Sequence, residues 1–544
     1  MKRLIITALL SVGVLTSFGQ TSSELYDISN FNFTGITARS AGMGGAFTSL
    51  GADMSTMSIN PAGMAMYSTA EIGMTMGLNI ANAKTNYGGD NNMSDGNTRF
   101  VVPNIAGVFI DGNVTIGVGI NTIANYNSQS SSLGNAEQFN SRTRIWADQM
   151  NGISSDSYYD LNPVQWNALM AYDNYIVNPN SSDDYGVWGV VDYDDMIASR
   201  YTNTTTGNLT EFVVSMGYNL NNKFYFGGTL GVQSLTYNQS SLYRETNVVD
   251  EYTTGALDDL VLGNRLNLTG VGFNLKLGAI ARPLPWLRVG VAYHSPTWLS
   301  VRETSYGDME ALFCDGTNNY ASTIDLWQEY NMQTPSRLLT GVSAAIGGIA
   351  IVSFDYEATW YNSMAYNTTI NTYGWRESTL SNDIDNLPNT SQYTSRTGDV
   401  DLNGMINNYY RMVNNFKVGV EVMPVSQFYL RAGYNYSTSP YQDIASNYVD
   451  DALMSDYGAI TRYTGGLGYR SGYFNIDLAY VYTGYTSLPS KYFDYVTTSS
   501  YDTGFNSSAG TPIIYGAGST IASEEAIFQQ NNYHNVLLTF SFRF

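Results

Sequence analysis

The end of the chain alternates between apolar and polar side chains. The last eleven residues carry Thr539, Ser541 and Arg543 on one row, whereas the other row is apolar and ends on aromatic rings. A strand that crosses a lipid bilayer needs roughly 9–11 residues, one face of which is apolar. We therefore expect the last strand of an outer-membrane β-barrel here. The aromatic residues Phe540, Phe542 and Phe544 would be its C-terminal signal for the barrel-assembly machinery.

The N-terminus has the layout of an export signal. Lys2 and Arg3 precede an apolar run over 4–15, and small residues follow up to Gly19. We expect residues 1–20 to be a signal peptide. The single cysteine, Cys314, lies far from the cleavage point, so neither a lipid anchor nor an intrachain disulfide is expected.

Composition narrows the class of membrane protein. After the signal, no stretch approaches the roughly 18 apolar residues of a transmembrane helix. In contrast, 44 Tyr, 22 Phe, 8 Trp and 52 Gly suit a barrel, because aromatic girdles lie at both lipid interfaces and glycine permits tight turns. An array of secreted β-sandwiches is the alternative that composition leaves open.

The mature chain is strongly acidic. Without Lys2 and Arg3, 23 basic residues face 46 acidic ones, so the net charge is −23. Nucleic acid is therefore excluded as a partner. Such acidity suits solvated loops, with bound divalent cations as a second explanation.

Segments with a period of two recur along the chain. Two of them place Lys417, Glu421 and Asp477 on the polar row. A charge on the lipid face costs about 2–4 kcal/mol at the bilayer midplane, so these three side chains are expected to face the lumen. The fourteen segments are 71–80, 100–110, 114–126, 211–219, 222–238, 269–281, 286–294, 337–346, 349–360, 414–423, 427–436, 459–470, 472–483 and 534–544.

The connections between these segments alternate in length. Short turns follow the even-numbered strands, and long connections such as 127–210, 295–336, 361–413 and 484–533 follow odd-numbered ones. Bacterial barrels place short turns in the periplasm and long loops outside, so both termini are expected in the periplasm. The sequence thus predicts an all-β fold: a monomeric, fourteen-stranded antiparallel transmembrane β-barrel over 71–544, with long extracellular loops.

A barrel of this size leaves a lumen that is either a channel or plugged. Residues 21–70 are the expected N-terminal hatch, or plug. Gly42, Gly44 and Gly45 would let its backbone approach the wall closely. Flexible Met side chains adapt to varied apolar ligands, so Met43, Met57, Met64 and the nearby Phe47 are candidate ligand contacts, with ordinary plug packing as the alternative.

Three features of this segment resemble the hatch of the FadL/TodX (OMPP1) outer-membrane transporter family. They are Ser40-Ala41-Gly42-Met43-Gly44-Gly45-Ala46, Asp53 and Asn60-Pro61-Ala62-Gly63. Further similarity lies in 284–296, 334–337 and 464–469. Members of that family take up long-chain fatty acids or aromatic hydrocarbons. The resemblance implies passive, hatch-gated lateral diffusion of a hydrophobic small molecule, with Asn60, Pro61 and Ala62 coupled to the opening.

The long connections depart from that family's better-known transporters. A branch of the family serves type IX secretion as a protein-shuttling partner. An outer-membrane interaction protein that shuttles secreted proteins or binds a surface ligand is therefore the alternative, and an aqueous porin is a third hypothesis. Lumenal cations could hold a carboxylate head group or pair with wall acids; they are Lys223, Lys276, Arg288, Arg337 and Lys417.

Little in the sequence suggests an enzyme or a cofactor. Two histidines, His294 and His534, and one cysteine supply too few ligands and nucleophiles for a zinc site or a catalytic triad, so no enzyme is expected. An outer-membrane hydrolase with a Ser–His pair around either histidine is the alternative. The segment 399–407 follows half of a calcium loop, in which Asp399, Asp401 and Asn403 would be Ca²⁺ ligands. Tyr410 stands where the bidentate Glu would be, so an Asx-rich turn is the alternative.

Overall fold

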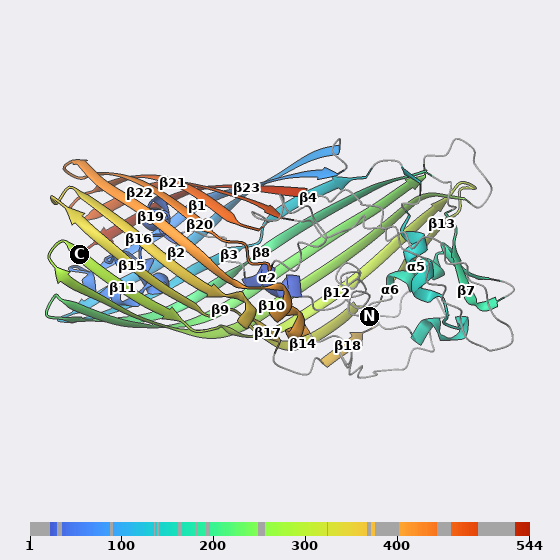
Figure 1. Cartoon of the computed structure of the whole chain (residues 1–544), viewed down its shortest axis with the longest axis horizontal. Coiled ribbons are helices and arrows are strands. Elements are labelled where there is room, and N and C mark those ends of the chain that lie inside the picture. The colour runs from blue at the N-terminus through green and yellow to red at the C-terminus, as the bar shows by residue number, and fades with distance from the viewer. Residues whose placement is uncertain are drawn as a thin grey trace.

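A closed antiparallel barrel dominates the computed structural model (Figure 1). The first strand pairs with the second on one side and with the last strand on the other, which closes the sheet. The structure describes residues 22–29, 35–87, 91–134, 137–138, 141–160, 166–180, 183–191, 196–247, 256–323, 325–366, 371–375, 402–442, 458–487 and 528–544.

Fourteen strands make up the wall, as predicted, although several are interrupted. In order around the wall, these are β1 (Glu71–Tyr87); β2 (Asn91–Asp111); β3 (Val114–Asn125), continued by β4 (Ser128–Leu133) and β5 (Glu137–Gln138); β8 (Met196–Leu220); β9 (Phe224–Asn247); β10 (Leu257–Leu284); β11 (Leu287–His294) with β12 (Trp298–Phe313); β14 (Asp325–Gln333) with β15 (Arg337–Ile346); β16 (Ala350–Trp360) with β17 (Ala365–Tyr366) and β18 (Asn371–Trp375); β19 (Met412–Val425); β20 (Phe428–Ser437); β21 (Ile460–Arg470); β22 (Phe474–Ser487); and β23 (Phe528–Arg543). A short strand, β13 (Asn318–Ser322), pairs with β12.

The outer surface near the short turns is apolar. Ile72, Ile116, Val291 and Phe354 are among the many large apolar side chains exposed there. Lys417, Glu421 and Asp477 face the lumen, which confirms their predicted orientation. In the described residues, no helix is long and apolar enough to cross a membrane.

The strands extend much further at the other end than the sequence suggested. The longest, β10, has 28 residues, where about ten suffice for a bilayer. The expectation that 295–336 is a loop is therefore wrong, because β12 and β14 occupy most of it. The segment 127–210 likewise contains β4 and the first half of β8. In β12 the outward residues Ser300 and Arg302 are polar and the inward Leu299 and Val301 are buried, which reverses the lipid-facing pattern.

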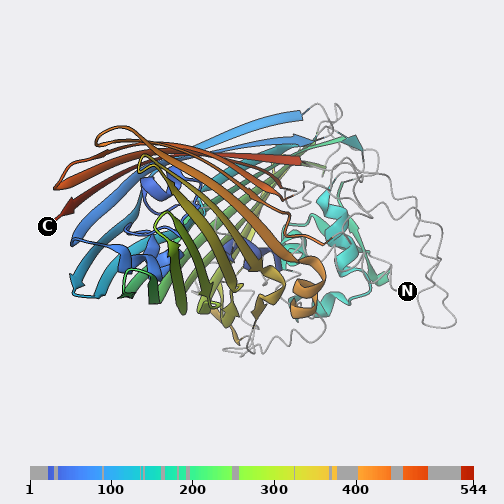
Figure 2. The same ribbon diagram turned by 60° about the vertical axis from the view of Figure 1, so that its left-hand side comes forward.

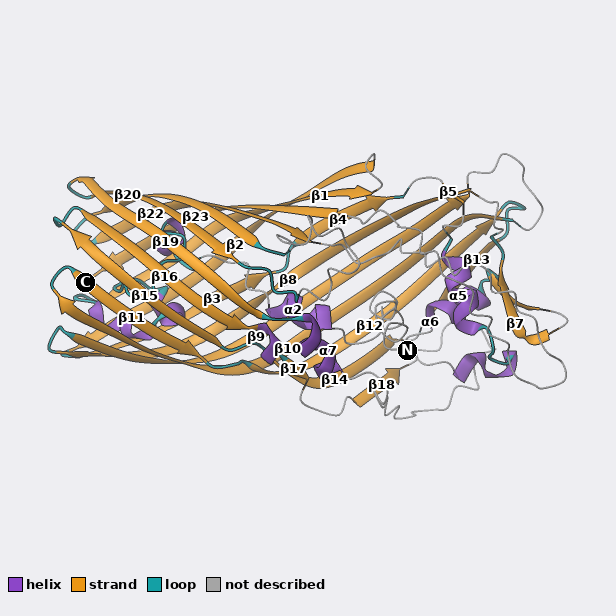
Figure 3. Cartoon of the chain, in the orientation of Figure 1, coloured by secondary structure: helices purple, strands orange, loops and turns teal. Residues whose placement is uncertain are grey.

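A small folded unit, here called the cap (residues 141–191), packs into this extended end (Figure 3). Its buried Trp146 and Met170 contact inward residues of the wall such as Leu260 and Met309. Glu245 of β9 accepts hydrogen bonds from Ser141 Oγ (2.7 Å) and from the backbone N–H of Arg142 (2.6 Å), at the start of the cap's first helix. The cap comprises α5 (Arg142–Met150), the 3₁₀-helix η2 (Ser155–Asp160), α6 (Trp166–Asp173), β6 (Val177–Asn180) and β7 (Asp183–Gly189).

Other helices lie inside the barrel or along its rim (Figure 2). The helix α2 (Ser22–Ser29) packs Leu25 and Ile28 against inward wall residues. The predicted signal peptide, 1–20, lies outside the described residues. The remaining helices are α3 (Ala38–Gly42), α4 (Thr56–Ile59), η1 (Pro61–Met66), η4 (Tyr361–Ser363) and α7 (Leu402–Tyr409).

Candidate functional site

Residues 35–70, here called the hatch, fill the lumen near the short turns. Almost all of their side chains are buried. The backbone N–H of Ala38 donates to Thr539 Oγ1 of β23 (2.8 Å), and that of Thr48 donates to Asp355 Oδ2 of β16 (2.7 Å). The hatch is thus attached to strands on different sides of the barrel.

Glycines allow this close approach. A Cβ on Gly42 would lie 3.3 Å from Gly466 Cα, and one on Gly44 would lie 3.0 Å from the Tyr434 nitrogen. Gly44 (φ +67°) and Gly45 (φ +74°) also adopt left-handed backbone conformations, which disfavour other residues.

Asp53 organises the turn between α3 and α4. Its Oδ1 accepts hydrogen bonds from Thr37 Oγ1 (2.7 Å), the Ser55 backbone N–H (2.9 Å) and Ser55 Oγ (2.6 Å). Thr37 is also the N-cap of α3 and accepts from the Ser40 N–H. The Asp53 carboxylate therefore links the N-terminus of α3 to Ser55, the residue before α4.

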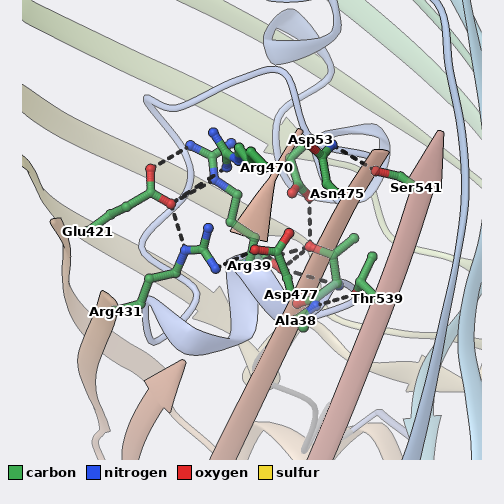
Figure 4. A network of polar contacts seen from close by, with 12 residues as sticks. Ala38, Arg39, Asp53, Glu421, Arg431, Arg470, Asn475, Asp477, Thr539 and Ser541 are labelled. Carbon is green, nitrogen blue, oxygen red and sulfur yellow. Dashed lines mark hydrogen bonds and ion pairs between the residues drawn. The ribbon is translucent and has the colours of Figure 1, made fainter. Parts of the chain in front are cut away.

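A buried ionic network joins the hatch to β19–β22 (Figure 4). Arg39 of α3 holds Glu421 with two parallel contacts of 3.0 Å. Arg431 donates to both Glu421 and Asp477 at 2.6 Å, and Arg470 lies 3.8 Å from Glu421. Burial alone would lower the pKa of Arg39, but Glu421 more than offsets this, so the pKa is raised and the guanidinium stays charged.

Removing the Glu421 carboxylate should lower the free energy of unfolding more than removing the Arg39 guanidinium. In Glu421→Ala, three guanidiniums retain only Asp477, so we expect a loss of about 3–5 kcal/mol. In Arg39→Ala, Glu421 keeps Arg431, and the expected loss is about 1–3 kcal/mol. Urea unfolding in lipid vesicles measures both. The control is Arg302→Ala, whose exposed pair with Glu329 contributes about 0–1 kcal/mol. Equal losses in the two hatch variants would contradict this ordering.

The Asn60-Pro61-Ala62-Gly63 turn packs against β9, β10 and β11. Asn60 Oδ1 accepts from the Ala62 N–H (3.1 Å) and caps η1, which Pro61 begins. Asn60 Nδ2 donates to the Thr48 carbonyl (2.6 Å). The wall accommodates the turn through glycines: a Cβ on Gly278 would lie 1.8 Å from Asn60 Oδ1. The coupling of these residues to an opening stays a prediction.

A single methyl group tests this contact. Gly278→Ala should displace the Asn60–Pro61 turn, because its Cβ would overlap the Asn60 amide oxygen. Gly228→Ala is the matched control on β9, since its Cβ would meet Leu277 at an ordinary 3.6 Å. Hydrogen exchange of hatch amides 55–66 should accelerate in the first variant and stay unchanged in the second. Unchanged exchange in Gly278→Ala would show that the turn does not rest on this glycine.

The backbone ladder between β2 and β3 stops short, although Thr122 Oγ1 of β3 still donates to the Val102 carbonyl of β2 (3.3 Å). Their ladder runs from Asp111↔Val114 only to Asn104↔Asn121, whereas β2 continues to Asn91. Pro103 adjoins the last pair and has no N–H to donate. Beyond the break, β3 bulges at Ile123. We call this break, formed by β2 residues 91–103 and β3 residues 122–125, the seam.

A hydrogen-bonded chain connects the seam to the hatch. Asn104 Nδ2 donates to Asn121 Oδ1 (2.6 Å), and Asn121 Nδ2 donates to Ser58 Oγ (2.8 Å). Ser58 Oγ in turn donates to Glu211 (3.2 Å), which is paired with Lys276. Sequence reasoning missed this chain, although Pro103 within an otherwise regular strand was a signal for the break.

The candidate ligand contacts Met43, Phe47, Met57 and Met64 are fully buried between hatch and wall. Met43 and Phe47 pack with Leu50, and Met57 and Met64 belong to another apolar cluster. None of the four lines the cavity described next. Their contact with a ligand stays a prediction.

A cavity of about 130 Å³ lies above the hatch. Ser58 and Ile59 of the hatch and Tyr26 of α2 line it, as does Ile123 in the bulge of β3. His294 Nε2 contacts the Ile59 carbonyl (2.9 Å), so a wall histidine also holds this part of the hatch. The charged lining residues are Arg337, Glu357, Lys417 and Arg462.

The five expected lumenal cations have different environments. Lys276 pairs with Glu211, and Glu357 accepts from Lys417 (2.5 Å) and lies 3.6 Å from Arg337. Lys223 is exposed in the turn before β9, so its lumenal placement is wrong. Arg288 is half-buried. Sequence reasoning missed three further lumenal arginines: Arg431, Arg462 and Arg470.

Of the expected calcium ligands, Asp399 and Asp401 lie outside the described residues. Asn403 belongs to α7, and its amide bonds the backbone N–H and carbonyl of Tyr366 (2.9 and 3.0 Å). The described residues contain no group of three or more His, Cys, Asp or Glu that could hold a metal ion. Calcium binding at 399–407 stays a prediction.

These features define a membrane-spanning β-barrel closed by an N-terminal hatch, and solved structures share its fold. The CymD monoaromatic hydrocarbon channel is 15% identical, with a TM-score of 0.50 over 95% of this chain and 99% of that one. The P. putida toluene transporter TodX is 13% identical (TM-score 0.52, 94% and 99%). A Pseudomonas aeruginosa FadL homologue is 12% identical (TM-score 0.50, 94% and 99%). No family model and no curated protein matches the sequence.

The chain therefore has the fold of the FadL/TodX channels: a fourteen-stranded antiparallel barrel with an N-terminal segment before the first strand. The fold that the hatch motifs implied is confirmed.

Proposed function

We propose that this protein is an outer-membrane channel that takes up hydrophobic compounds by hatch-gated lateral diffusion. The cavity is the transit site, and the seam is the exit into the bilayer. The observation that carries the proposal is that one cavity touches the hatch at Ser58 and Ile59 and the bulge of β3 at Ile123.

The seam suits an apolar solute. Phe100 and Val102, in the part of β2 that has no backbone ladder to β3, are exposed on the outer face of the barrel. Since the neighbouring outward residues of β3 are also apolar, this side of the wall faces hydrocarbon. A ligand that passes between the two strands would enter the bilayer without crossing the aqueous compartment below the hatch.

The chain of hydrogen bonds from Ser58 to Asn121 and Asn104 would couple the hatch to the seam. A shift of α4 would withdraw the Ser58 hydroxyl from the last ladder pair, Asn104↔Asn121. This pair would then be free to separate and lengthen the seam. Asn60, Pro61 and Ala62 follow α4 directly and would transmit the shift to η1.

The proposed orientation places the short turns in the periplasm and the cap outside the cell. Both termini are then periplasmic, and the aromatic end of β23 meets the barrel-assembly machinery from that side. The exported precursor would lose residues 1–20, and residues 21–70 would form the plug domain within the barrel of 71–544.

Uptake by cells that lack their own transporter tests the route. We expect Ile123→Trp to abolish uptake of labelled palmitate and toluene, because the indole would fill the cavity beside the seam. Ile120→Trp is the matched control, because Ile120 lies three residues away on the same strand and points to lipid. Uptake is compared at equal amounts of folded, heat-modifiable barrel.

Two results would contradict the proposal. Undiminished uptake in Ile123→Trp would exclude the seam as the route. A lack of uptake in the wild type, with the barrel folded and surface-exposed, would exclude a transporter of either compound.

A lack of uptake would favour the alternative that this protein is an outer-membrane interaction protein. Features of the cap support that alternative. Tyr175 and Trp188 of the cap are 67% and 53% exposed. Tyr175 also has φ +60° at the end of α6, where glycine is the usual residue. An exposed aromatic ring kept at a strained position suits contact with a secreted protein or a surface ligand.

A further inference from the structure

The hairpin of β1 and β2 continues beyond the apolar band of the wall. Phe100 is the large apolar side chain exposed nearest to this end of β2, and residues 91–99 are polar or small apart from Met93. In the proposed orientation this stretch stands in water outside the cell, where it projects from the rim beside β4 (Figure 1). Its backbone is regular, because every residue from Asn91 to Val101 pairs with β1 without a register shift.

The edge of this stretch that faces away from β1 is unpaired. β2 pairs with β3 only from Asp111 to Asn104, and no strand among the described residues forms a ladder with this edge of 91–99. The extensions of β8, β9 and β10, in contrast, are paired on both edges. An unpaired edge presents the N–H and C=O of every second residue, so it is a template for one more strand.

The usual protections of an edge strand are missing over 91–99. Proline, lysine or a β-bulge commonly blocks the addition of a strand. These nine residues contain neither proline nor lysine, and their pairing with β1 has no bulge. Ser94, Gly96 and Thr98 are small and exposed, so they leave room for the side chains of a neighbour. The stretch is therefore open to a partner strand.

The direction of β2 decides which strand can add to it. β2 runs from the rim toward the short turns, and antiparallel pairing is the more stable arrangement. A partner strand would therefore run away from the membrane. A second copy of this protein in the same membrane also directs its β2 toward the short turns, so the two β2 edges cannot pair antiparallel. The partner that fits is an extended segment of a different polypeptide.

Two charges define the chemistry of that segment. Asp95 and Arg99 are four residues apart, so they lie on the same face of β2. No ion pair in the described part of the chain engages either side chain. Opposite charges that face each other stabilise antiparallel strands, so the partner should carry an acid opposite Arg99 and a base opposite Asp95. Because the partner runs in the reverse direction, its acid precedes its base by four residues.

We propose that β2 residues 93–99 bind an extended segment of another polypeptide outside the cell, which adds to the sheet as an antiparallel strand with an acid opposite Arg99 and a base opposite Asp95. Gly96 leaves space for an aromatic side chain on the partner. The inference goes beyond the proposed uptake and takes only its orientation from it. Its tests measure no transport, so a failure of either proposal leaves the other standing.

A synthetic peptide, Val-Glu-Val-Thr-Tyr-Lys-Val, tests this surface on the wild-type barrel in lipid nanodiscs. With its Glu opposite Arg99, its Tyr faces Gly96 and its Lys faces Asp95. We expect saturating peptide to slow hydrogen exchange of amides 93–99, because every second one is unpaired in the free barrel. The amides of β1 residues 79–86 are the internal control, since they lie between two ladders and should exchange slowly throughout.

Two outcomes of this experiment would overturn the inference. Uniformly slow exchange of 93–99 without peptide would show that the edge is already covered. Exchange that the saturating peptide leaves unchanged would show that the edge does not accept a strand.

Modified peptides separate strand addition from a general attraction of charges, with binding measured by fluorescence polarisation. N-methylation of alternate amides removes the donors of one edge, so one alternating set should abolish binding and the other should preserve it. Exchange of Glu and Lys in the peptide should weaken binding by about two- to tenfold. The barrel variant Asp95→Lys with Arg99→Glu should reverse that preference. Equal effects of the two methylated sets, or no reversal, would overturn the antiparallel pairing.

Discussion

The need to pair every backbone N–H and C=O within hydrocarbon governs this structure. The β1–β23 ladder satisfies it where the sheet closes, over sixteen residue pairs. The third strand satisfies it differently. Beyond Ile123 the third strand continues as β4, which pairs with β8. β4 passes on the inner side of β1, where Thr85 Oγ1 of β1 donates to the Ser131 carbonyl of β4. This crossing leaves one edge of β2 without a ladder partner, which is why the proposed route places the exit at the seam.

The hatch is held by two different kinds of contact. On one side, Arg39 enters a buried ionic network with Glu421 and Arg431, and such networks hold one geometry because each unpaired charge is costly. On the other side, the turn at Asn60 fits against glycine backbone of β9 and β10. The helix α4 lies between these attachments and reaches the wall near the seam through Ser58. A partial movement of α4 is therefore easier than expulsion of the whole hatch.

The sequence predicts the membrane-spanning part well, since lipid imposes an apolar outward row on every strand. All fourteen spanning segments and the inward placement of Lys417, Glu421 and Asp477 follow from that constraint. The extensions of the strands escaped prediction because they stand in water, where Ser300 and Arg302 face outward. The partners of Arg39 could not be predicted, since Glu421 is separated from it by 382 positions and local pattern carries no information on such a pairing.

Most of the charged side chains that line the cavity lie on one side of the lumen, which in the proposed function would set the direction of passage. The wall residues of the ionic network and the cavity residues Lys417 and Arg462 all lie on β19–β22, whereas Arg39 of the network belongs to α3. Opposite them, the inward residues at the base of β2 are Asn104, Ala106 and Val108, which carry no charge, and the nearest buried charges, Glu211 and Lys276, neutralise each other. An apolar group that covered the charged side chains would remove their water without replacing its hydrogen bonds, which is unfavourable. The uncharged side chains of β2 impose a smaller cost. In the proposed route, the strands that separate would therefore also be the strands along which an apolar group leaves.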